Sequence, residues 1–182
     1  MMNLNNEIFY LINTKMSNSV FDIIMPNVTE LGSLEVIAAV CIIFLILTRK
    51  NIFNLGKYYG LAKTIVLSVL LMFIVTSFIK LTFSMPRPYM ILNGVNVLTD
   101  SIDPNSFPSG HTATAASFLT VIVINAKEYF KRYKLVICLA VLYVVLVGFS
   151  RIYTGMHFPT DVVTGAIIGI VCGIVATRIL KV

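Results

Sequence analysis

Charged residues are scarce in this chain of 182 residues: only 12% are Asp, Glu, Lys or Arg, whereas 58% are hydrophobic. The mean hydropathy is +0.91. Soluble domains carry about 25% charged and about 45–50% apolar residues, so this composition excludes a water-soluble domain. Apolar runs long enough to cross a bilayer core, about 20 helical residues for about 30 Å, recur along the sequence. We therefore predict one polytopic membrane domain.

The sequence also lacks features that are typical of other classes of protein. The net charge of +6 comes without a basic soluble face carrying base-stacking aromatic residues, so it does not indicate nucleic-acid binding. The three cysteines, Cys41, Cys138 and Cys172, lie inside apolar runs, and their spacing suggests neither a metal site nor a disulfide framework. The first residues, MMNLNNEIFY, lack a basic n-region and a small-residue cleavage site, so we expect no signal peptide to be removed.

The apolar segments predict an all-α membrane helix bundle. Five of them are long and apolar enough for transmembrane helices: Leu31–Thr48, Leu61–Lys80, His111–Ala126, Leu135–Ser150 and Val162–Leu180. Residues 5–30 are apolar at helical spacing but are broken by polar residues and by Pro26. We interpret them as interfacial or half-inserted helices, with a sixth span as the alternative. The predicted organisation is an N-terminal segment at 1–30 and a core at 31–182.

The distribution of basic residues predicts the orientation in the membrane, because short cytoplasmic loops carry an excess of Lys and Arg. Ten basic residues fall on one side of the predicted spans: Arg49, Lys50, Lys57, Lys63, Lys127, Lys131, Arg132, Lys134, Arg178 and Lys181. We assign this side to the cytoplasm. Only Lys15, Lys80, Arg87 and Arg151 are left for the opposite side, which also receives the long loop from Phe83 to Gly110.

Six ionisable residues converge on this extracytoplasmic side: Lys80, Arg87, His111, Arg151, His157 and Asp161. Charged groups at a membrane boundary are costly unless they reach the interface or are paired, so their convergence indicates a functional site. Three of the six are Lys or Arg. Guanidinium groups match phosphate oxygens with a planar fork of donors, and an ammonium adds a point charge. The chemistry predicted for this side is therefore phosphate handling.

Two short segments support an anion site. In FPSGHT, Pro108 and Ser109 are typical of a helix start, and Gly110 allows close approach to the backbone N–H groups at a helix N-terminus. In GMHFPTD, Pro159 predicts that the last helix begins there, with Asp161 in its first turn and His157 just outside it. A carboxylate at that distance can bond one ring nitrogen of the histidine and leave the other as a nucleophilic lone pair.

Three motifs in the segment 80–161 resemble, in order and spacing, the signatures of the type 2 phosphatidic acid phosphatase superfamily, which also includes vanadium haloperoxidases. They are K80-x6-R87-P88, P108-S109-G110-H111 and S150-R151-x5-H157-x3-D161. The N-terminal run with NVTELGS and the closely connected spans are similar to the small bacterial integral-membrane members. The motif positions show no departure from the family pattern.

The resemblance implies a role for each matching residue. His157 would be the nucleophile, Asp161 its orienting partner, and His111 the general acid on the leaving oxygen. Lys80, Arg87, Ser109, Gly110 and Arg151 would hold the phosphoryl oxygens. The family forms a phosphohistidine intermediate without a metal, and the sequence has no carboxylate cluster suited to Mg²⁺. We therefore expect no metal and no cofactor.

Together, these expectations predict an integral membrane lipid phosphatase with an outward-facing site. We expect it to lie in a bacterial cytoplasmic membrane. Undecaprenyl diphosphate is the first choice of substrate, and phosphatidylglycerophosphate or phosphatidic acid is the alternative. An anion transporter would instead place ionisable groups near the middle of the spans, whereas Glu35, Lys63 and Arg178 lie near their ends. A non-catalytic lipid-binding protein is the third possibility. We interpret Asp100 and Asp103 as ordinary turn residues.

Overall fold

A computed structural model describes residues 4–100 and 103–181, and the regular elements of these residues are helical. The longer helices are α2 (Ser19–Glu30), α3 (Leu34–Arg49), α4 (Tyr59–Phe83), α6 (Gly110–Tyr129), α7 (Tyr133–Tyr153) and α8 (Pro159–Leu180). Shorter elements are α1 (Leu4–Tyr10), α5 (Pro88–Ile91), a π-helical turn at Leu11–Lys15, and 3-10 turns at Ile52–Asn54 and Gly56–Tyr58. The predicted all-α bundle is confirmed.

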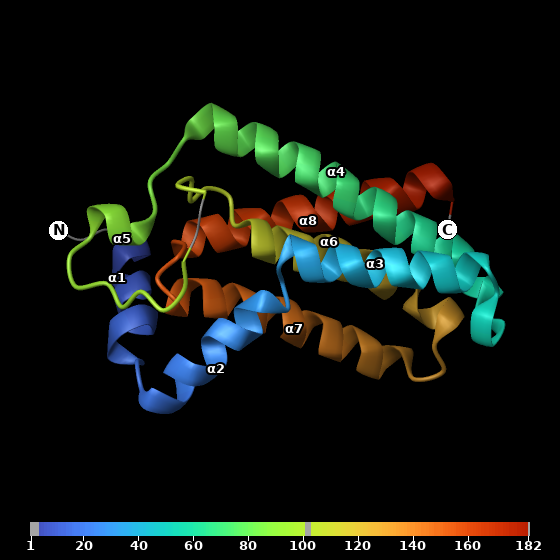
Figure 1. Ribbon diagram of the computed structural model, residues 1–182, viewed down its shortest axis with the longest axis horizontal. Helices are drawn as coiled ribbons and strands as arrows, with labels where there is room; N and C mark the ends of the chain where they lie inside the picture. The colour runs from blue at the N-terminus through green and yellow to red at the C-terminus, as the bar shows by residue number, and fades with distance from the viewer. Residues whose placement is uncertain (1–3, 101–102, 182) are drawn as a thin grey trace.

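Helix α6 is the centre of the bundle, where it contacts α3, α4, α7 and α8 (Figure 1). Its buried positions are mostly small or polar, among them Thr112, Ala113, Ala116, Ser117 and Asn125. Small side chains let neighbouring helices approach closely in a membrane. The segment predicted as the third span is therefore a helix that packs closely against its neighbours through small and polar side chains.

Three helical stretches are long and apolar enough to cross a membrane: 56–83, which contains α4, then α7 and α8. Helices α2 and α3 meet at an angle of 47°, and together they would make a fourth span. Predicted helices over 61–80, 135–150 and 162–180 thus correspond to candidate spans. Five spans remain a prediction, because α6 is not among these candidates and α3 qualifies only together with α2.

The N-terminal helices pack against the rest of the bundle. Asn13 donates to the backbone oxygens of Tyr153 and Asn96, and its side chain is fully buried. Phe9 is also fully buried, with its ring centroid 5.6 Å from that of Phe158. Helix α1 therefore lies beside the start of α8, at the end of the bundle that holds α5 (Figure 1).

Three glycines of α8 bring it close to α6. A Cβ added at Gly165 would lie 2.5 Å from Ser109 O, and one at Gly169 would lie 2.4 Å from Ala113 O. A Cβ added at Gly173 would lie 2.6 Å from Thr120 Cβ. The three glycines therefore pack against a neighbouring helix of the same bundle. The close approach also places the start of α8 beside the start of α6, where Ser109 N donates to Asp161 O at 3.0 Å.

Candidate active site

The end of α4 and the segment that follows it contribute two cations. Lys80, in the last turn of α4, pairs with the Asp103 carboxylate and donates to Asn105 O at 2.8 Å. Arg87 is 3% exposed, and its Nε donates to Asp103 O at 2.8 Å. Although partial burial alone would raise it, the pKa of Asp103 is lowered by the Lys80 hydrogen bond, the Asn105 backbone N–H and nearby positive charge. Asp103 is therefore ionised beside Lys80.

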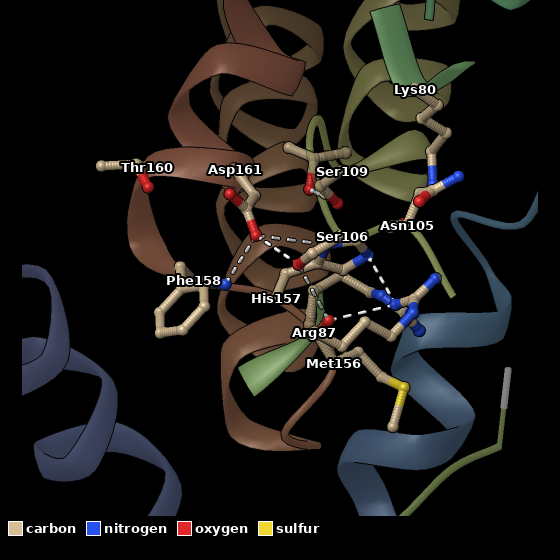
Figure 2. Close-up of polar contacts among 12 residues, drawn as sticks. Lys80, Arg87, Asn105, Ser106, Ser109, Met156, His157, Phe158, Thr160 and Asp161 are labelled. Carbon is tan, nitrogen blue, oxygen red and sulfur yellow. Dashed lines mark hydrogen bonds and ion pairs between the residues drawn. The ribbon is translucent and has the colours of Figure 1, made fainter. Parts of the chain in front are cut away.

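His157 lies just before α8, as predicted, and is 1% exposed. Its Nε2 is 3.3 Å from Arg87 Nη1, and its Nδ1 is 3.6 Å from Asp161 Oδ2 (Figure 2). A guanidinium group can only donate hydrogen bonds, so Nε2 faces Arg87 as an acceptor. This contact favours the tautomer in which Nδ1 carries the proton and Nε2 keeps its lone pair.

The surroundings of His157 keep its ring neutral. Burial lowers the pKa of His157 well below 6.5, and the positive charges of Arg151, Arg87 and Lys80 lower it further. A neutral imidazole is the form that can act as a nucleophile. The cations that would hold a phosphate thus also keep the neighbouring histidine unprotonated.

The FPSGHT segment forms the start of α6, with Ser109 at the N-cap position. The Ser109 side chain does not cap the helix but lies 3.0 Å from Thr112 Oγ1. A Cβ added at Gly110 would meet no described atom within 4 Å, so there is open space in front of this helix end. An anion could therefore approach the N–H groups at the α6 N-terminus.

Arg151, near the end of α7, is 4% exposed. Its Nη1 donates to Thr29 Oγ1 at 2.8 Å, and among the described residues no atom accepts a hydrogen bond from its Nε. A buried N–H without a partner costs about 1–3 kcal/mol. The Nε–H of Arg151 is therefore suited to donate a hydrogen bond to an oxygen atom of a bound ligand.

A cavity of about 250 Å³ brings these groups together. Six of the eight residues predicted for the site line it: Lys80, Arg87, Gly110, His111, Arg151 and His157. The other two, Ser109 and Asp161, are buried beside it, at 0% and 3% exposure. Leu34, Met72 and Phe73 give the cavity an apolar side between α3 and α4.

Three contributors to the site did not stand out in the sequence. Ser106 contacts both His157 and Asp161, Thr29 contacts Arg151, and Asp103 pairs with Lys80. Asp103 does make the expected turn, accepting a hydrogen bond from Asn105 N at 2.9 Å, but it also lines the cavity. These contacts join residues far apart along the chain, and neither a serine nor a threonine at those positions signals them.

Residues 61–182 match the PAP2 superfamily. Among curated proteins, the chain is 30% identical to undecaprenyl-diphosphatase BcrC of Bacillus subtilis over 96% of its own length and 83% of that protein. It is 26% identical to an undecaprenyl-diphosphatase of Sulfolobus acidocaldarius over 58% of its own length, and that match spans about half (48%) of the relative.

Two solved structures share the arrangement of helices. The crystal structure of Aquifex aeolicus LpxE is 33% identical, with a TM-score of 0.79 over 97% of this chain and 96% of that one. A PAP2-type phosphatidylglycerolphosphate phosphatase from Bacillus subtilis is 22% identical, with a TM-score of 0.79 over 99% of this chain and 88% of that one. The second likeness concerns the fold alone. The family match covers residues 61–182, and undecaprenyl-diphosphatase BcrC aligns with 96% of this chain. The chain therefore belongs to the PAP2 superfamily and is a membrane lipid phosphatase, a hydrolase of phosphoric esters.

Proposed function

We propose that this phosphatase uses His157 as its nucleophile and His111 as its general acid. The observation that carries the proposal is the cavity, in which both histidines face the same space as Lys80, Arg87 and Arg151. A neutral, buried imidazole whose Nε2 contacts Arg87, in a cavity that Lys80 and Arg151 also line, is suited to attack a phosphorus atom that those cations hold.

The reaction follows in two steps. The Nε2 lone pair of His157 forms a bond to phosphorus while the bond from phosphorus to the leaving oxygen breaks, and His111 gives that oxygen a proton. Water then attacks the phosphohistidine, returns a proton to His111 and releases inorganic phosphate. Asp161 stabilises the imidazole as it becomes positively charged.

The charges of Arg87, Arg151 and Lys80, together with the α6 N-terminus, would stabilise the negative charge of the transferred phosphoryl group. In this proposal the cations stabilise the negative charge that a metal ion stabilises in other phosphatases. Lys80 and Asp103 are paired, so a phosphate oxygen would compete with the Asp103 carboxylate for Lys80. We expect hydrolysis without a metal or other cofactor.

For the substrate, we propose undecaprenyl diphosphate, hydrolysed at a site that faces outward. Two observations support this choice: the curated relatives with matching sequence include two undecaprenyl-diphosphatases, and one of them aligns with 96% of the chain. The apolar side of the cavity, at Leu34, Met72 and Phe73, suits a lipid tail that stays in the bilayer. Phosphatidylglycerophosphate and phosphatidic acid are the alternatives within the same chemistry.

A panel assay tests the proposal. Purified protein in detergent is given undecaprenyl diphosphate, phosphatidylglycerophosphate and phosphatidic acid, and released phosphate is measured with and without EDTA. We expect the highest kcat/KM on undecaprenyl diphosphate and no loss with EDTA. His157→Ala should abolish turnover but still bind the lipid, since the cations remain. Substantial turnover by His157→Ala, or an absolute metal requirement, would contradict the site assignment.

A further inference from the structure

We propose that Asn13 is a positioning residue for the nucleophile. Its side chain holds the turn at residues 154–158, which connects α7 to α8 and carries His157. Asp161 orients the ring of His157, and Asn13 fixes the backbone from which that ring extends. The inference rests on the proposed function, because it takes His157 as the nucleophile.

The end of α7 takes hydrogen bonds from groups outside the helix. The last carbonyl groups of a helix have no partner within it. The oxygen of Arg151 accepts the N–H groups of Met156 and His157, at 3.1 and 3.2 Å. The oxygen of Tyr153 accepts a hydrogen bond from Asn13 Nδ2 at 2.8 Å. The side chain of Asn13 therefore completes the helix end from which the turn departs.

The same amide also binds the loop between α5 and α6. Asn13 Nδ2 donates to Asn96 O at 2.7 Å, and Asn13 Oδ1 accepts the Asn96 N–H at 2.9 Å. Two residues further along the loop, Leu98 N donates to Thr154 O at 3.3 Å. The packing is close, because a Cβ added at Gly155 would lie 2.8 Å from Asn96 O and 3.4 Å from Asn13 Nδ2. Asn13 thus fixes the loop and the turn to each other.

The first turn of α8, on the other side of His157, is held by the N-terminal segment as well. Asn5 Oδ1 accepts the Thr160 N–H, and Asn5 Nδ2 donates to Thr160 Oγ1, both at 3.1 Å. The buried ring of Phe9 packs against Phe158. The N-terminal helical segment therefore contacts the chain before and after the nucleophile (Figure 1).

The burial of Asn13 makes its hydrogen bonds difficult to replace. Its side chain is fully buried, so water does not compete for these contacts. Without the amide, the backbone groups of Tyr153 and Asn96 lose this partner and shift toward others. A displacement of about 1 Å between reacting groups can slow a reaction about 100-fold. The effect of Asn13 therefore falls on the rate at which His157 attacks phosphorus.

Two of the cations that line the cavity are held from outside the turn. Lys80 pairs with Asp103, and Arg151 donates to Thr29. Displacement of the turn should therefore change the affinity for a phosphate group much less than it changes the rate of attack. This difference separates a positioning role from a general loss of structure.

Asn13→Leu tests the proposal, because it keeps a buried side chain of similar size but removes the amide. Single-turnover rates are measured on a saturating lipid phosphate, together with the inhibition constant of a lipid phosphonate that cannot be hydrolysed. We expect the rate to fall about 10- to 100-fold and the inhibition constant to change by less than about threefold. A wild-type rate in the folded Asn13→Leu protein would overturn the proposal.

Two further variants serve as controls. Asn125→Leu removes another buried amide, one that donates to Val121 O within α6, and should leave the rate unchanged. Gly155→Ala leaves Asn13 in place but pushes the turn away from Asn96, and should reproduce the slow rate even if Asn13→Leu does not fold. An equal loss of rate in Asn125→Leu, or a wild-type rate in Gly155→Ala, would overturn the proposal.

NMR of histidine-labelled protein gives a readout that does not depend on activity. The chain has two histidines, and a His111→Gln variant assigns their ¹⁵N signals. We expect the ring signals of His157 to shift in Asn13→Leu and those of His111 to stay in place, because His111 lies on α6. Unchanged His157 signals would overturn the positioning role. Turnover by His157→Ala would instead overturn the proposed function.

Discussion

His157 shows how a single residue depends on the charges around it. Burial and the three neighbouring cations hold its pKa well below 6.5, so acid protonates the folded ring only well below the pH at which a free histidine titrates. A bound oxyanion offsets the cations and therefore raises this pKa. We predict that the ring is neutral at the pH at which a free histidine titrates when no ligand is bound, and that its pKa is higher with vanadate bound.

An NMR titration of the labelled ring, with and without vanadate, measures both states. Titration of His157 near pH 6.5 in the empty enzyme would contradict the prediction. So would a pKa that falls when vanadate binds.

The proposed role of His111 predicts a dependence on the leaving group. General acid catalysis is worth about 10²–10⁴-fold and matters most when the departing oxygen is basic. A lipid monophosphate expels a basic alkoxide, whereas a diphosphate expels a lipid phosphate, which is a much weaker base. His111→Ala should therefore retain relatively more single-turnover activity on a lipid diphosphate than on a lipid monophosphate. His157→Ala should lose both activities, and equal slowing of both substrates by His111→Ala would assign that residue to phosphate binding.

At the residue scale, the sequence predicted the parts of the site that lie in motifs. His157 lies just before α8 and Asp161 lies in its first turn, so their proximity follows from the short separation of four residues. Ser106 is 51 residues from His157, and Thr29 is 122 residues from Arg151. Such contacts depend on how helices pack, and no spacing within one sequence specifies them.

At the scale of elements, the bend between α2 and α3 connects the N-terminal helices to the site. Thr29, in the last turn of α2, is fully buried and accepts the hydrogen bond from Arg151. Ser33 caps α3 just beyond the bend, where its hydroxyl accepts the Val36 N–H. The chain around the bend is therefore in a position to orient a phosphate-binding arginine.

We predict that Thr29→Val weakens phosphate binding more than it slows the chemical step. The variant keeps the side-chain shape but removes the acceptor for Arg151, and a hydrogen bond to a charged group is worth about 1.5–3 kcal/mol. The inhibition constant for vanadate and KM should rise about tenfold, with a smaller change in kcat. Thr29→Ser should retain wild-type constants.

A matched control for this experiment is Thr64→Val. Thr64 is also fully buried, but its hydroxyl donates to Gly60 O within α4. An equal rise in KM for Thr64→Val, or a Thr29→Val variant whose only change is a lower melting temperature, would show that Thr29 is merely structural.

The helices themselves were predicted where apolar residues are continuous. The segments predicted at 135–150 and 162–180 lie within α7 (Tyr133–Tyr153) and α8 (Pro159–Leu180). Hydropathy detects the apolar middle of a helix but not the polar turns that extend it, and the start of α8 was predicted from Pro159 instead. The boundary predicted after residue 30 agrees with the end of α2 at Glu30, and the span predicted at Leu31–Thr48 overlaps α3 (Leu34–Arg49).

At the scale of the whole molecule, the site and most of the basic residues lie at opposite ends of the bundle (Figure 1). The basic residues flank the end of α3, the start of α4, the turn from α6 to α7, and the end of α8. The cavity lies where α4 and α7 end and where α6 and α8 begin. By the positive-inside rule, this polarity predicts a site that faces outward.

Cysteine labelling in intact cells tests this orientation after Cys41, Cys138 and Cys172 have been replaced. Phe53→Cys and Lys131→Cys, both at exposed positions of the basic end, should be protected from an impermeant thiol reagent. Val97→Cys, at an exposed position of the loop near the site, should react. The reverse pattern would place the site in the cytoplasm and contradict the proposed outward-facing site.

The most direct measurement of the proposed chemistry is to trap the phosphorylated enzyme. Protein is exposed briefly to lipid labelled in the transferred phosphate, quenched in alkali to preserve phosphohistidine, and mapped by mass spectrometry. We predict phosphate on His157 in the wild type and none in His157→Ala. Phosphate on His111 instead, or sustained turnover by His157→Ala, would contradict the assignment of His157 as the nucleophile.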